Sequence, residues 1–267
     1  MSPLLVDITW GNFDAPRFPH KVNFSLPTVD RPCRDGLKRP ETIPLFLRRG
    51  FCTKDVQKCP TDLHTVIPMV TPIILASGSE IRGRLLQQAN IPHAIEKPRV
   101  DEDAIKLAMQ KDGATPRDIA DALAEAKARR ISAKHPEALV LGCDQVLDHR
   151  GEMMSKPTSR ADAIAQLTRF RGDRHMLLSA AVLYESGRPI WRHIGPVRLR
   201  MREVSDTYIA DYVERNWESI RHSVGCYKLE EEGVRLFSSI EGDYFHVLGM
   251  PLLELMNYLV LRGELDT

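Results

Sequence analysis

From residue 72 onwards, short runs of apolar residues alternate with amphipathic stretches, and this alternation predicts both strands and helices. Residues 73–76 and 138–142 are apolar runs of the length typical of strands buried on both faces. Between these runs, apolar residues at helical spacing predict a helix through Ala89, a second after Asp101 and a third over residues 117–132.

The second half of the chain adds further elements of both kinds. Ser159 is expected to cap a helix that ends near Phe170, and two strands are expected over about 175–185 and 190–202, joined by a turn. A helix is expected from Ser205 to about Arg215, and Pro251 should open a terminal helix that reaches Arg262. The segment 225–249 is punctuated by glycines. Together these elements predict an α/β domain with a mixed sheet.

Residues 1–68 show no sustained period of either kind. This stretch holds nine of the eighteen prolines, and proline removes a hydrogen-bond donor and restricts the residue before it. We therefore expect a poorly ordered N-terminal extension, followed by a folded domain over residues 69–267. Our hypothesis is that the extension reflects an early start-codon assignment.

Composition narrows the class of protein. Thirty-seven basic and thirty-six acidic residues leave a formal charge of +1, which predicts no nucleic-acid partner. No apolar run approaches the length of a transmembrane helix, and no basic-then-apolar signal opens the chain. The five cysteines form no CxxC pair, so free thiols are expected. These features predict a cytoplasmic protein with no membrane partner.

Polar residues stand where the predicted strands end, which is where α/β sheets bind ligands. Ser77-Gly78-Ser79 lies between a strand and a helix start, and Arg82 follows within one turn, a pattern that suits an anion but also suits ordinary helix capping. Asp144 interrupts an apolar run, where a carboxylate needs a cation, a metal or strong donors. It can equally be a strand-end residue that caps a loop.

Further charged residues fit the same site. Asp101-Glu102-Asp103 can stabilise a helix start or bind a divalent metal, and Lys127 and Lys156 can be surface lysines or phosphate ligands. Taken together, an anion-binding turn, two lysines and separated carboxylates suit phosphoanhydride hydrolysis. In that chemistry cations stabilise phosphate charge while a carboxylate activates water.

Residues 73–262 resemble the Maf family of nucleoside triphosphate pyrophosphatases, also described as septum-formation inhibitor-like proteins. Seven ordered motifs carry the resemblance: Leu75-Ala76-Ser77-Gly78-Ser79-x-x-Arg82, Val100-Asp101-Glu102, Ala124-x-x-Lys127-Ala128, Gly142-Cys143-Asp144-Gln145-Val146, Ser155-Lys156-Pro157, Ile240-Glu241-Gly242-Asp243-Tyr244 and Val247-Leu248-Gly249-Met250-Pro251-Leu252. The first 68 residues have no counterpart in the family.

The resemblance implies a fold, an activity and a set of site residues. The fold is an elongated mixed sheet flanked by helices, with two lobes around a central cleft, and it commonly forms a homodimer. The activity is house-cleaning hydrolysis of a modified or non-standard nucleotide between the α- and β-phosphates. Asp144 is implied as the proton acceptor, and Glu102 with Asp144 as ligands of Mg²⁺ or Mn²⁺. The implied triphosphate ligands are Ser77, Ser79, Arg82, Lys127 and Lys156.

Departures from the family pattern bear on substrate and activity. Glu80-Ile81 replaces the usual Pro-Arg, so one of two arginines is missing, with Arg84 a candidate substitute. Gln145, Lys228 and Glu230 resemble the base-specificity residues of the branch acting on 7-methylguanosine triphosphate, whose cationic base an acidic side chain would match. The alternatives are a dTTP/UTP-type pyrophosphatase and a non-catalytic nucleotide-binding regulator of cell division.

Overall fold

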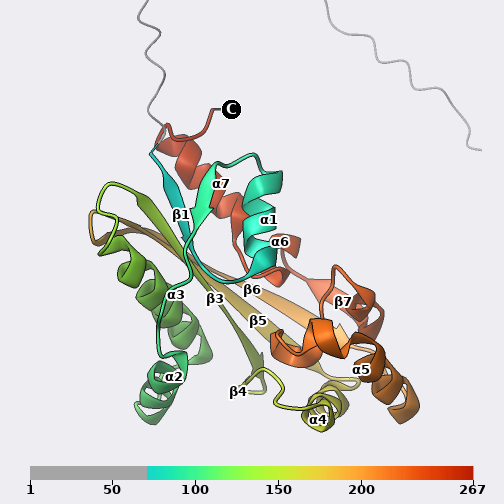
Figure 1. Cartoon of the computed structure of the whole chain (residues 1–267). Helices are drawn as coiled ribbons and strands as arrows, with labels where there is room; N and C mark the ends of the chain where they lie inside the picture. Colours follow the sequence, from blue (N-terminus) through green and yellow to red (C-terminus); the bar gives the residue numbers. More distant parts are fainter. Residues whose placement is uncertain (1–70, 267) are drawn as a thin grey trace, which may run out of the picture. The chain divides into compact units, whose positions relative to one another are not determined.

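Residues 71–266 are described by the computed structural model, and within this range helices and strands alternate along the chain (Figure 1). The elements are β1 (Ile73–Ala76), α1 (Glu80–Gln88), β2 (His93–Ile95), α2 (Glu102–Lys111), α3 (Pro116–Ser132), β3 (Leu139–His149), β4 (Glu152–Met154), α4 (Arg160–Phe170), β5 (Arg174–Glu185), β6 (Arg188–Met201), α5 (Asp206–Ile220), β7 (Phe237–Glu241), α6 (Tyr244–Val247) and α7 (Leu252–Leu261). The predicted N-terminal extension, residues 1–68, lies outside the described residues.

The strands of this range form one mixed sheet in the order β2-β1-β3-β5-β6-β7, with β4 paired to β3. β1 runs parallel to β2 and to β3, whereas β3, β5, β6 and β7 follow one another antiparallel. The predicted α/β class with a mixed sheet flanked by helices is confirmed.

Alternation along β3 decides which helix each side chain meets. Val140 and Val146 belong to the core beneath α3, on one face of the sheet. Leu141 and Leu147 point to the other face, because successive residues of a strand face opposite sides. There Leu141 packs in the core of α1 and α7, and Leu147 in the core of α4 and α5. Figure 1 shows these two groups of helices at different places along the sheet.

The pairing of β3 is interrupted midway along one edge. β1 pairs with residues 139–142, and β4 pairs with residues 147–149. Residues 143–146 between them pair only with β5 among the strands that the structure describes. β1 and β4 therefore border a stretch of β3 with one open edge, and Asp144 lies within it. The two lobes around a central cleft stay a prediction.

The expected helices and strands are present, β3 continues to His149, and the main differences concern α5 and the segment 225–249. α5 ends at Ile220 rather than near Arg215, because Trp217 and Ile220 continue its packed face. β7 and α6 lie in the segment for which the sequence indicated only glycine punctuation. Four of the five β7 residues are exposed, so the strand has no buried face to produce an apolar pattern, and its pairing with β6 defines it.

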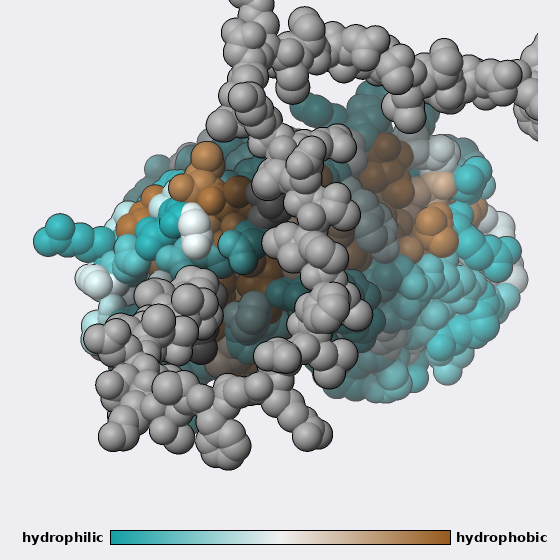
Figure 2. Space-filling view, turned by 90° about the horizontal axis from the view of Figure 1, so that it is seen from above, coloured by the Kyte–Doolittle hydropathy of each residue, from teal (hydrophilic) through white to brown (hydrophobic). Residues whose placement is uncertain are grey.

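On the face drawn in Figure 2, hydrophobic residues gather in patches between hydrophilic ones. No helix within residues 71–266 has both the length and the apolar character needed to cross a membrane.

The homodimer that the resemblance implies stays a prediction.

Candidate active site

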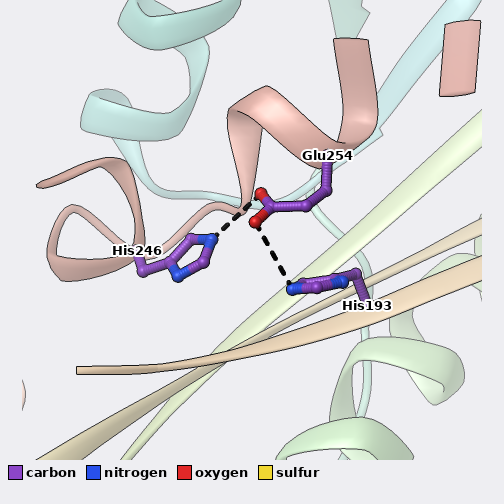
Figure 3. A group of neighbouring side chains, drawn as sticks. All are labelled: His193, His246 and Glu254. Carbon is purple, nitrogen blue, oxygen red and sulfur yellow. Dashed lines mark hydrogen bonds and ion pairs between the residues drawn. The ribbon is translucent and has the colours of Figure 1, made fainter. Parts of the chain in front are cut away.

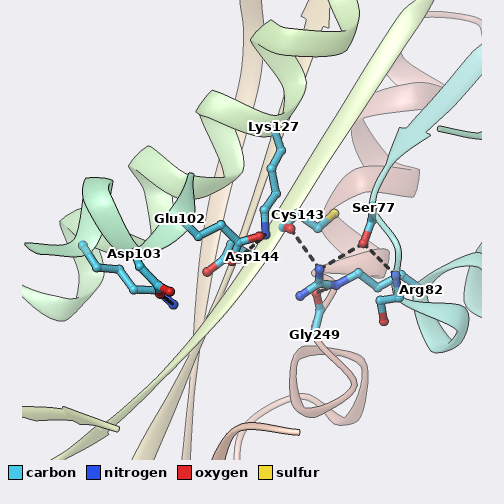
Figure 4. Close-up of polar contacts among 10 residues, drawn as sticks. Ser77, Arg82, Glu102, Asp103, Lys127, Cys143, Asp144 and Gly249 are labelled. Atoms are coloured by element: carbon cyan, nitrogen blue, oxygen red, sulfur yellow. Dashed lines mark hydrogen bonds and ion pairs between the residues drawn. The ribbon is translucent and has the colours of Figure 1, made fainter. Parts of the chain in front are cut away.

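Asp144 and Lys127 form a buried ion pair at the open edge of β3. The Lys127 Nζ donates to Asp144 Oδ1 at 2.6 Å, and each side chain is 9% exposed. Lys127 belongs to the buried face of α3, which packs on the sheet face that Asp144 points to. A buried carboxylate needs a cation, and Lys127 provides it. The sequence prediction that these two residues converge is confirmed (Figure 4).

The acidic cluster at the start of α2 divides into three roles. Asp101 caps the helix, accepting a hydrogen bond from the Ala104 amide at 3.0 Å. The side chain of Asp103 is 98% exposed. Glu102 alone turns toward Asp144, with its Oε1 2.9 Å from Lys127 Nζ. The helix-start alternative is thus met by Asp101, and metal binding by Glu102 stays a prediction.

Glu102 is held in its charged form. Partial burial by itself raises the pKa of a carboxyl group, but the charge and hydrogen bond of Lys127 act against it. The charges of Lys106 and Lys156 act in the same direction as Lys127, and the pKa of Glu102 lies below its usual value. Lys156 is exposed in the loop after β4, so its influence on Glu102 is what ties it to the site.

The turn after β1 is fixed by Arg82. The Ser77 hydroxyl accepts hydrogen bonds from the Ser79 amide at 3.2 Å and from Arg82 Nη1 at 3.3 Å. Arg82 also donates from Nη1 to the Cys143 carbonyl at 2.9 Å, and from Nε to the Gly249 carbonyl at 2.8 Å. The carbonyl next to Asp144, on the open edge of β3, is thus bound by an arginine that also contacts the serine turn (Figure 4).

Arg82 is therefore a structural link as well as a cation. It is nearly buried and connects β1, β3 and the segment between α6 and α7. The sequence assigned it to the triphosphate alone. Gly249, whose carbonyl it holds, was seen only as part of a motif, because nothing in a glycine's identity marks its carbonyl as a partner.

Lys97 is a candidate that the sequence analysis missed. Its aliphatic chain lies against the serine turn, so that a Cβ on Gly78 would be 3.2 Å from Lys97 Cδ. It stands in an irregular segment between β2 and α2, where no periodicity singles out one residue. Its charge adds a cation beside the turn that precedes α1.

Gln145 and Lys228, both predicted to read the base, contact residues other than Asp144 and Lys127. Gln145 points to the opposite face of the sheet, and its Nε2 donates to Ser179 Oγ and to the carbonyls of His246 and Val247. The structure thus gives the Gln145 amide group a positioning role in holding α6. Lys228 is ion-paired with Glu231 at 3.2 Å.

Glu230 and Arg84 are exposed. Burial raises the pKa of Glu231, but hydrogen bonds from Ser219 and Lys228 and the charges of Lys228 and Arg84 outweigh it, and the pKa lies below its usual value. Arg84 therefore lies near the loop of Lys228 and Glu231.

Cys143 and Cys226 are free, as predicted, and both are buried, while the other three cysteines lie outside the described residues. Cys143 packs in the core of α1 and α7, and burial raises the pKa of its thiol to about 11. A thiol with so high a pKa is a poor nucleophile at neutral pH. The cysteine beside Asp144 therefore serves packing rather than reactivity.

The carboxylates of this site suit a divalent cation of the Mg²⁺ type. Asp144 and Glu102 approach the same point, which the ammonium group of Lys127 shares. Carboxylate oxygens are the ligands that Mg²⁺ and Mn²⁺ prefer. With a serine turn at a helix start on one side and this pair on the other, the site can hold an anionic chain next to a proton acceptor.

Comparison with known proteins points to one family. The Maf-like protein family matches residues 72–261. A nucleoside triphosphate pyrophosphatase from Ruegeria pomeroyi is 64% identical over 199 residues, which cover 74% of this chain and 100% of that protein. A nucleoside triphosphate pyrophosphatase 1 from Jannaschia sp. is 48% identical, over 72% of this chain and 96% of that protein. A nucleoside triphosphate pyrophosphatase from Caulobacter vibrioides is 47% identical, over 73% of this chain and 98% of that protein.

Proposed function

Since the chain belongs to the Maf-like protein family, we propose that it is a nucleoside triphosphate pyrophosphatase, an acid-anhydride hydrolase that releases a nucleoside monophosphate and pyrophosphate. The observation that carries the proposal is the convergence of Asp144, Lys127 and Glu102 at the open edge of β3. Arg82 joins this edge to the serine turn through the Cys143 carbonyl.

Asp144 is the proton acceptor in this proposal. Its Oδ1 is held by Lys127, and its other oxygen takes a proton from a water molecule as the water oxygen attacks the α-phosphorus. The bond from this phosphorus to the oxygen bridging the α- and β-phosphates breaks, and pyrophosphate leaves with the electron pair. The hydrogen bond from Lys127 orients the carboxylate toward the attacking water.

The triphosphate is bound by the turn and by the cations around it. Ser77 and Ser79 precede α1, whose N-terminal amides and dipole favour an anion. Lys156 and Arg82 contribute positive charge from the loop after β4 and from α1. Such preorganised charge stabilises the negative charge that develops on the leaving pyrophosphate.

Glu102 and Asp144 would hold Mg²⁺ or Mn²⁺ in the same site. When bound, the cation would neutralise phosphate charge and polarise the phosphoryl oxygens. Lys127 would then share both carboxylates with the cation, so its position helps to set how tightly the metal is held.

We expect 7-methylguanosine triphosphate to be the preferred substrate in a panel that also contains GTP, dTTP and UTP. Exposed Glu230 is the residue proposed to meet the cationic base, since Gln145 is engaged elsewhere. Glu230→Gln should lower kcat/KM for the methylated base by about tenfold, and leave the other three nearly unchanged. Phosphorus NMR of the products provides the measurement.

The matched control is Glu218→Gln, which makes the same change at an exposed glutamate of α5. Equal losses for all four triphosphates would remove Glu230 from base recognition. If nucleotides raise the melting temperature but no product forms, the chain is a non-catalytic nucleotide-binding regulator. A preference for dTTP or UTP would instead indicate a dTTP/UTP-type pyrophosphatase.

We further propose that residues 69–267 suffice for activity. The match with the Ruegeria pomeroyi relative covers 100% of that protein but only 74% of this chain. A 69–267 fragment should therefore keep kcat/KM within about twofold of the full chain, because every residue of the proposed site lies inside it. A large loss of activity or of melting temperature in the fragment would show that the first 68 residues belong to the folded enzyme.

A further inference from the structure

Two histidines and a glutamate from three elements meet at one point that the proposed hydrolysis does not use. His193 lies in β6, His246 in α6 and Glu254 in α7 (Figure 3). The His246 Nε2 is 3.0 Å from Glu254 Oε2, and His193 Nε2 is 3.6 Å from Glu254 Oε1. One ligand atom from each residue lies within 4.8 Å of the other two.

The position of His246 is set by the backbone of β6. A Cβ on Gly195 would lie 2.1 Å from His246 Nδ1, so only glycine at this point lets the imidazole approach the strand. Gly195 stands two residues after His193, and the two therefore share one face of β6. The His246 side chain is 7% exposed and the rest of the cluster is partly exposed, which leaves a route from solvent.

The donor atoms of the cluster are two imidazole nitrogens and a carboxylate oxygen, and both kinds of group are established ligands of divalent metals.

We propose that His193, His246 and Glu254 bind one Zn²⁺ ion, with water as the fourth ligand. Two histidines and one carboxylate form a ligand set that zinc accepts in tetrahedral geometry. Zinc–ligand bonds of about 2.0–2.2 Å place neighbouring ligand atoms roughly 3.4 Å apart. Here the two histidines lie 3.0 and 3.6 Å from different oxygens of Glu254, and one ligand atom of each residue lies within 4.8 Å of the other two. Imidazole nitrogens distinguish this site from the all-oxygen pair of Glu102 and Asp144.

Zinc at this site would fix the segment that supports the active site. The carbonyl of His246 accepts hydrogen bonds from Gln145 Nε2 and Ser179 Oγ. Three residues later, the carbonyl of Gly249 holds Arg82. The ion would thus join α6 and α7 to β6 at the point where this segment is also bound to β3 and α1. The role is structural, and it does not depend on which nucleotide is hydrolysed.

The test is a calorimetric titration of the full chain with Zn²⁺ in excess Mg²⁺, which occupies oxygen-only sites. We expect one Zn²⁺ per chain and a higher melting temperature when it is bound. Co²⁺ in its place should give the visible absorption of a tetrahedral site without a thiolate charge-transfer band. His193→Gln and Glu254→Gln should each weaken binding at least tenfold, by analogy with the roughly 10–100-fold losses seen when outer-shell partners are removed.

His222→Gln, at an exposed histidine after α5, is the matched control and should bind Zn²⁺ like the parent. His193→Gln changes a partly exposed residue, so its melting curve without zinc should match that of the parent. Failure to bind Zn²⁺ in excess Mg²⁺, equal weakening by all three substitutions, or a thiolate band that assigns the metal to cysteines would each overturn the proposal.

Discussion

Replacing Asp144 with asparagine is expected to lower kcat for pyrophosphate release by about 10²- to 10⁴-fold. The asparagine amide has nearly the same shape as the carboxylate, and its oxygen can still accept the hydrogen bond from Lys127. The variant therefore removes the negative charge of the side chain while keeping the contact. What disappears is the group that takes a proton from water. The measurement is the steady-state release of pyrophosphate by the parent and the variant under saturating substrate and Mg²⁺.

Asp103→Asn is the matched control, because it makes the same chemical change one residue from Glu102 on a side chain that is 98% exposed. It should keep kcat within about twofold of the parent, since it touches none of the convergent groups. Circular dichroism of both variants should match the parent. Unchanged turnover in the Asp144 variant would end its role as proton acceptor.

Gly142→Ala is expected to have the largest effect on stability. A Cβ on Gly142 would lie 2.2 Å from the Ala124 carbonyl oxygen and 2.7 Å from the Ala128 amide nitrogen. Both atoms belong to the backbone of α3, so relief requires the helix to move away from β3. We expect a loss of about 3 kcal/mol in the free energy of unfolding, which lowers the melting temperature by roughly 6–12 °C.

The same shift should reduce activity, because α3 carries Lys127 and β3 carries Asp144. Displacement of the pair should cost more than about tenfold in kcat. Gly83→Ala is the control. The one tight contact of its Cβ would be with the end of the exposed Ile95 side chain, which can turn aside, while His93 Nε2 would lie at an ordinary 3.8 Å. Alanine also favours the helix by about 1 kcal/mol. Equal melting temperatures for the two variants would contradict the close approach of α3 to β3.

The local patterns of the sequence determined most of the elements and singled out Asp144, whereas they left Lys127 open as a surface lysine or a phosphate ligand. Apolar runs define β1 and β3, and caps such as Ser159 and Ser205 define the helix starts, because both signals arise within a few residues. Asp144 could be singled out for a related reason, since a charge inside a buried run demands a partner. Where no local signal exists, as in the exposed strand β7, the prediction gave no element.

Only the tertiary structure decided which neighbours in the sequence share a site. Gln145 follows Asp144 directly, yet it points to the opposite face and binds the backbone of α6. The open edge of β3, the Gly249 carbonyl that holds Arg82, and the meeting of His193 with Glu254 all depend on contacts between distant segments. Periodicity along a chain specifies the face of each element, whereas the pairing of elements is set by packing over the whole fold, and that packing determines which polar groups meet.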